Sequence, residues 1–121
     1  MSKEFHAIIV DKSLRDLGIL NQLNVIGETT DDDWTLYKIA VPEEDIKKTA
    51  KLIQGNLAEG SWYFHFYNED GSKLIVVFRE KTFKTDNKPE NWNEAIKYGA
   101  SLSIPKEQLD FYPNNFAAEK Y

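Results

Sequence analysis

Short apolar runs alternate with polar clusters along the chain, and the first of them predict a strand, a helix and a hairpin. Residues 5–10 are apolar at nearly every position, which is typical of a strand covered on both faces. Asp11 and Ser13 can cap a short helix in the segment that follows. Residues 24–29 and 34–41 flank a Thr-Asp-Asp-Asp cluster that favours a turn, so we expect them to form a hairpin.

The clearest helix is expected to begin at Pro42, whose fixed backbone angle suits a first helical position. Its buried stripe is predicted from apolar spacings of four, three and four residues: Ile46, Ala50, Ile53 and Leu57. Lys47, Lys48 and Lys51 lie off this stripe, and we interpret them as the solvated face of the helix.

A second hairpin is predicted from two apolar runs, residues 62–67 and 72–79, that flank Asn-Glu-Asp-Gly. If Asn68 opposes Ser72, one face of this hairpin is wholly apolar and belongs in the core. The other face then carries a mixed set of residues: Tyr63, His65, Tyr67, Lys73, Ile75 and Val77.

The C-terminal third is predicted to be helical. After a polar connection at 81–88, Pro89 opens a helix, and Pro105 starts one further helical turn. Residues 113–121 show no firm pattern and are expected to form a loose tail of a single domain that spans 1–121.

The order of these elements predicts the fold class. Strand, helix, strand, strand, helix, strand is the order of an α+β domain with a ferredoxin-like βαββαβ antiparallel sheet. Here we expect this sheet to be extended by a further hairpin strand and followed by C-terminal helices.

The composition argues against several classes of partner and location. The chain has 121 residues, no cysteine and a formal net charge of −5. The lack of cysteine favours a reducing compartment, and residues 1–20 hold no apolar signal or span, so we expect a cytoplasmic protein with no membrane partner. Because the chain is acidic and has no basic stripe, nucleic acid is not an expected partner.

One sheet face is the candidate ligand or interface face. It consists of Tyr63, His65, Tyr67, Ile75 and Val77. An apolar patch of this size on a monomer needs a cover, for which three candidates stay open: the C-terminal helices, a second copy of the chain, or a ligand.

The two histidines are the candidates for chemistry. His65 is suited to proton transfer near neutral pH, with Tyr63 and Arg79 as assisting residues. His6, His65 and Glu80 form an alternative metal-ligand set if the two strands bring them together. The competing interpretation is that His65 is a packed histidine between two tyrosines. No phosphate-binding glycine loop is present, and no cofactor is expected.

Two segments carry a family resemblance. SWYFHFYNEDGSKLIVVFREKTF and NWNEAIKYGASLSIPKEQLDFYP resemble a family of small prokaryotic proteins of about this length with no assigned activity. The resemblance implies a stand-alone cytoplasmic protein, and it brings no substrate or catalytic residue.

Two functional hypotheses follow from the sequence. The leading one is a dimeric, non-enzymatic binding or interaction module that uses the tyrosine and histidine face. The alternative is a small enzyme, or a protein that binds a ligand or metal, with His65 as acid, base or ligand.

Overall fold

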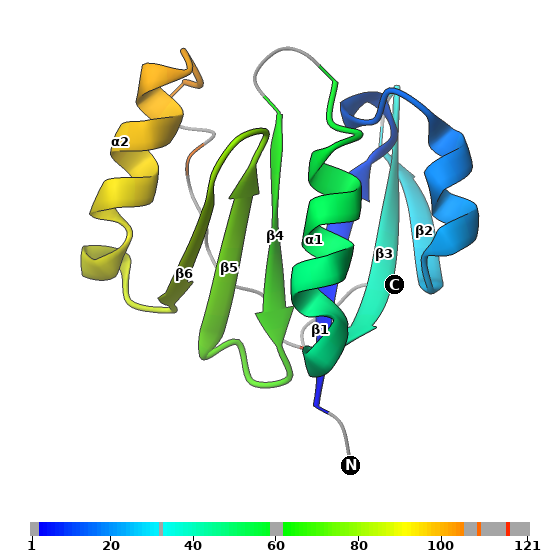
Figure 1. Cartoon of the computed structure of the whole chain (residues 1–121), viewed down its shortest axis with the longest axis horizontal. Helices are drawn as coiled ribbons and strands as arrows, with labels where there is room; N and C mark the ends of the chain where they lie inside the picture. The colour runs from blue at the N-terminus through cyan, green and yellow to red at the C-terminus, as the bar shows by residue number, and fades with distance from the viewer. Residues whose placement is uncertain (1–2, 32, 59–61, 106–108, 110–115, 117–121) are drawn as a thin grey trace.

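An antiparallel sheet of six strands forms the centre of the molecule (Figure 1). The computed structural model describes residues 3–31, 33–58, 62–105, 109 and 116. The strands lie in the order β2-β3-β1-β4-β5-β6. Their bounds are β1 Glu4–Val10, β2 Val25–Asp31, β3 Trp34–Pro42, β4 Tyr63–Asn68, β5 Lys73–Phe78 and β6 Thr82–Asp86.

In the described part of the chain, two α-helices accompany the sheet. Helix α1, Ile46–Gln54, crosses in front of it in Figure 1, and α2, Asn93–Ser101, lies beside β6. Among the described residues, no helix is long and apolar enough to cross a membrane.

Strand β1 is covered on both faces, as its continuous apolar run predicts. It pairs with β3 along its whole length and with β4 from Phe5 to Ala7. The neighbours Phe5 and His6 point to opposite faces, and both are buried. The run at 5–10 therefore occupies the interior of the sheet.

The ferredoxin-like βαββαβ prediction is wrong. The connection between β1 and β2 is described throughout, and it contains only two 3₁₀ segments, η1 Asp11–Ser13 and η2 Leu17–Gln22. The intervening residues pair with the chain after α1: Leu14 bridges Leu57, and the Arg15 N–H donates to the Asn56 carbonyl at 2.8 Å. These strand-like bonds use backbone groups that a helix would need for its own bonds.

The sequence analysis also missed strand β6. Its residues were expected to form a polar connection, yet they pair antiparallel with β5. Phe83 anchors the strand, since its ring meets Phe78 edge-on at a centroid distance of 5.9 Å. The order of strands and α-helices is therefore βββαβββα, a sheet-dominated mixture of strands and helices.

The predictions of the β2–β3 hairpin and of helix α1 are confirmed, with element boundaries that differ by a few residues. Pro42 ends β3, the short 3₁₀ segment η3, Glu43–Asp45, follows, and α1 begins at Ile46. The predicted stripe is buried at Ile46, Ala50 and Ile53.

The β4–β5 hairpin has a register one residue away from the predicted one. Tyr67 opposes Leu74 and Phe66 opposes Ile75, so the loop holds four residues, 69–72. Asn68 explains the difference, because its side-chain oxygen accepts the Lys73 N–H at 2.9 Å. Since side chains alternate along a strand, this slip moves Ile75 and Val77 to the opposite face.

Two hydrophobic clusters cover the two faces of the sheet, which we call the α1 face and the α2 face. The α1 face includes Phe64, Phe66, Ile75 and Val77 together with the buried side of α1. On the α2 face, a second cluster joins residues of β5 to C-terminal ones: Leu74, Val76, Phe78, Trp92, Ala95, Ile104 and Leu109.

The C-terminal helix agrees with the sequence analysis. The 3₁₀ segment η4, Pro89–Asn91, precedes α2, and the Trp92 indole N–H donates to the Asp86 carbonyl at 2.7 Å. Most of the helical turn expected after Pro105, and all of the tail at 113–121 except Phe116, lie outside the described residues.

Candidate functional site

The structure places both histidines on the α2 face, one on each side of Tyr67. His6 opposes Tyr67 across β1 and β4, and their rings meet edge-on at 6.1 Å. His65 precedes Tyr67 on the same side of β4, with a ring distance of 6.3 Å. Tyr67 itself is only 1% exposed, so it is a core residue rather than a surface one.

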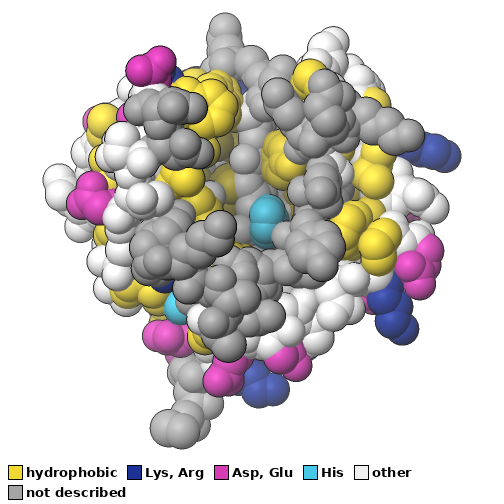
Figure 2. Space-filling view, turned by 180° about the vertical axis from the view of Figure 1, so that it is seen from behind, with side chains coloured by type: hydrophobic (Ala, Val, Ile, Leu, Met, Phe, Trp, Pro, Cys, Tyr) yellow, Lys and Arg dark blue, Asp and Glu magenta, His cyan; other side chains and the backbone are white. Residues whose placement is uncertain are grey.

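A residue near the C-terminus covers part of this face. The Phe116 ring stacks on the imidazole of His6, and its backbone N–H donates to the Glu69 carbonyl at 3.0 Å. Figure 2 shows this side of the molecule, with one histidine side chain visible near the centre of the view. Phe116, from the C-terminal part of the chain, therefore covers part of the sheet face that was expected to need a cover.

His65 is held in its neutral form. Burial lowers the pKa of His65 to about 4, because the charged imidazolium loses its hydration inside the protein. Tyr63 shares this face of β4, and it packs against Phe78 at a ring distance of 5.4 Å. These contacts suit a packed histidine, and acid–base chemistry at His65 stays an untested prediction.

The predicted metal set is not brought together. Arg79 and Glu80 lie in the turn between β5 and β6, where Glu80 is exposed. No group of three His, Asp or Glu side chains in the described part of the chain is arranged to hold a metal ion.

The five residues of the predicted ligand face do not share one surface. Tyr63, His65 and Tyr67 lie on the α2 face, whereas Ile75 and Val77 pack on the α1 face. Self-association through the tyrosine and histidine face stays a prediction, to be tested by a concentration-dependent mass.

A groove lies on the α1 face between α1 and strands β5 and β6. It has a volume of about 980 Å³. The apolar side chains of Phe5, Ile46 and Ile75 contribute to its lining. Four lysines also line it, Lys47, Lys51, Lys73 and Lys84, and we call it the lysine groove.

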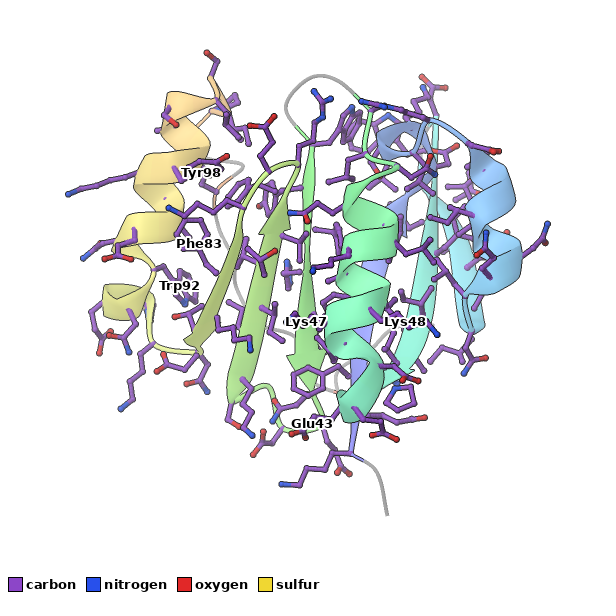
Figure 3. The ribbon with its side chains drawn as sticks, in the orientation of Figure 1. Glu43, Lys47, Lys48, Phe83, Trp92 and Tyr98 are labelled. Atoms are coloured by element: carbon purple, nitrogen blue, oxygen red, sulfur yellow. The ribbon has the colours of Figure 1, made fainter. Side chains whose placement is uncertain are left out.

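The two walls of the lysine groove come from elements far apart in sequence. Lys47 and Lys51 are one turn apart on α1, while Lys73 and Lys84 belong to β5 and β6. Figure 3 shows Lys47 on the side of α1 that faces β5 and Lys48 on the other side of the helix. Lys48 is accordingly absent from the described lining.

The groove lysines carry free positive charge. All four are exposed, and none makes an ion pair with another residue of the described part of the chain. Three acidic residues also line the groove, Glu43, Glu44 and Asp86. The Asp86 carboxylate accepts hydrogen bonds from the Lys88 backbone N–H and the Asn91 amide, which lower its pKa and keep it negatively charged.

Sequence reasoning missed this groove for two reasons. Lys47 and Lys51 were assigned to a solvated helix face, and Lys84 lies in a segment whose strand was not predicted. The available signal was the i, i+4 spacing of Lys47 and Lys51, which places both on one flank of the helix.

Comparisons with known proteins identify no relative. No family model, no curated protein and no solved structure matches the chain. The resemblance to a family of small prokaryotic proteins therefore stays a prediction.

Proposed function

We propose that this chain is a non-enzymatic binding module that holds an anionic ligand in the lysine groove. One observation carries the proposal: four exposed lysines without ion pairs in the described structure surround a single groove. The described lining holds these four lysines and three acidic residues, a net charge of +1, whereas the chain as a whole has a net charge of −5.

The lining of the groove supports binding rather than catalysis. A concave site with apolar walls and a few placed polar groups is the usual form of a ligand site. Among the described residues that line the groove there is no histidine, the side chain best suited to proton transfer near neutral pH. The two hydroxyl side chains present, Thr82 and Thr85, have no such base beside them in that lining.

The expected affinity is modest. An exposed pair of opposite charges contributes about 0.2–1 kcal/mol, so four such contacts together give about 1–4 kcal/mol. A dissociation constant of about 1 mM corresponds to about 4 kcal/mol. A small anion should therefore bind with a dissociation constant between about 1 mM and about 0.2 M, and only at low ionic strength, because salt screens exposed charges.

Isothermal titration with inorganic tripolyphosphate at about 20 mM salt tests the proposal. We expect binding to the native protein and a loss of about tenfold or more in the K47E/K51E variant. The matched control is K48E/K88E, which changes the net charge by the same amount at two lysines outside the groove lining. Equal weakening in both variants would show that binding follows net charge alone, and the proposal would then be abandoned.

A further inference from the structure

The two walls of the lysine groove run in the same direction. At their C-terminal ends, the Gln54 side-chain amide donates to the Phe78 carbonyl at 2.6 Å, which fixes the end of α1 beside the end of β5. Figure 1 shows α1 and β5 extending from the same end of the molecule. Lys47 and Lys73 lie near the starts of these two elements, so they belong to the same end of the groove.

The lysines on both walls repeat with nearly the same spacing. Lys51 lies four residues beyond Lys47, a rise of about 6 Å along the helix. Lys84 opposes Ile75, which is two residues beyond Lys73, a rise of about 7 Å along the strand. The groove therefore offers two successive pairs of lysines, with one lysine from each wall at each level, and Asp86, which opposes Lys73, belongs to the first level.

This repeat matches an extended polypeptide. Alternate residues of an extended chain point to the same side and lie about 7 Å apart. A glutamate at each of two alternate positions can place one carboxylate at each level of the groove. Its methylene groups then lie along the groove wall, whose lining includes Ile75 and Ala50.

The same features disfavour single-stranded nucleic acid, whose phosphates also repeat along a chain. Proteins that bind single strands offer aromatic rings on which bases stack. The one aromatic residue in the described lining is Phe5, which is only 3% exposed. The net charge of −5 also opposes a long polyanion.

We infer that the ligand of the lysine groove is an extended segment of a partner protein with glutamates at alternate positions. This inference rests on the proposed function, since it names the class of anion that the same groove takes. It also requires that spacing, and not charge alone, governs binding.

Two five-residue peptides of equal charge test the inference: acetyl-Glu-Ser-Glu-Ser-Ser-amide, with glutamates at alternate positions, and acetyl-Glu-Glu-Ser-Ser-Ser-amide, with clustered glutamates. We expect the alternating peptide to bind about fivefold more tightly than the clustered one. We also expect K47E/K51E and K73E/K84E each to weaken the alternating peptide by about tenfold, and K48E/K88E by less than about twofold.

The remaining outcomes separate the two proposals. Equal binding of the two peptides, or tighter binding of a five-nucleotide oligothymidylate, overturns the inference about ligand class. If tripolyphosphate binds in the groove and neither peptide does, the inference fails while the proposed function stands. If no anion binds, both fail. Thermal unfolding of each variant, with a midpoint close to that of the native protein, establishes that lost binding is not lost folding.

Discussion

The Phe116 ring lies 3.7 Å from the imidazole of His6, with an angle of 11° between the two ring planes. This stack joins a residue near the C-terminus to the first strand of the sheet. Because Phe116 also meets Tyr67 edge-on at 6.3 Å, the three rings form one aromatic group over β1 and β4. The contact closes part of a sheet face that would otherwise present aromatic surface to water.

Phe116→Ala is expected to lower the free energy of unfolding by about 1–3 kcal/mol, because it removes both ring contacts and part of the cover of the α2 face. Urea unfolding followed by tryptophan fluorescence measures the change. If the midpoint is unaltered, the Phe116 stack contributes nothing to the fold.

Because burial lowers the pKa of His65, we expect the folded protein to become less stable in acid. The unfolded chain binds a proton on His65 near pH 6.5, whereas the folded chain does so only near pH 4. Between these values the unfolded state holds more protons, so the free energy of unfolding falls as the pH is lowered, by up to about 3 kcal/mol. Above about pH 7.5 His65 is neutral in both states and adds no pH dependence.

The His65→Gln variant is the control for this pH effect. Its unfolding free energy should change less than that of the native protein over the upper part of the window, above about pH 5, where carboxylates contribute least. Equal slopes for the two proteins between pH 6.5 and 5 would mean that His65 is hydrated in the folded state.

A pair of glycine substitutions tests the packing of α2. A Cβ atom at Gly99 would collide with Leu109 and approach Phe78, whereas one at Gly55 meets only ordinary contacts of 3.5 Å or more. We expect Gly99→Ala to destabilise the protein by about 1–3 kcal/mol and Gly55→Ala to be neutral or stabilising by up to about 1 kcal/mol. Thermal unfolding compares them, and a stable Gly99→Ala variant would contradict the close approach of Leu109.

Elements with a strong apolar pattern could be predicted from the sequence. Strand β1 and helix α1 bury most of the residues that their periods indicate, because burial is what creates those periods. Strand β6 has only Phe83 as an apolar residue, so its pairing depends on the rings of Phe78 and Tyr98, which lie elsewhere in the chain. Local pattern cannot show such long-range support.

The register of the β4–β5 hairpin depends on side-chain hydrogen bonds that composition does not reveal. Asn68 accepts the Lys73 N–H, and the Asp70 carboxylate accepts the Ser72 N–H, which together stabilise a four-residue loop. The one-residue slip separates Ile75 from His65 and so alters the candidate site. The lysine groove depends on this register as well, because it places Ile75 on the α1 face and Lys84 pairs opposite Ile75 in the neighbouring strand β6.

The central claim is that anions bind in the groove between α1 and strands β5 and β6. The most direct measurement is a two-dimensional amide NMR titration of the native protein with tripolyphosphate at low salt. We expect the largest changes in amide chemical shift at residues 47, 51, 73 and 84, and only small changes at Lys48 and Lys88. Shifts spread evenly over all lysines, or centred on His6 and His65, would contradict this expectation.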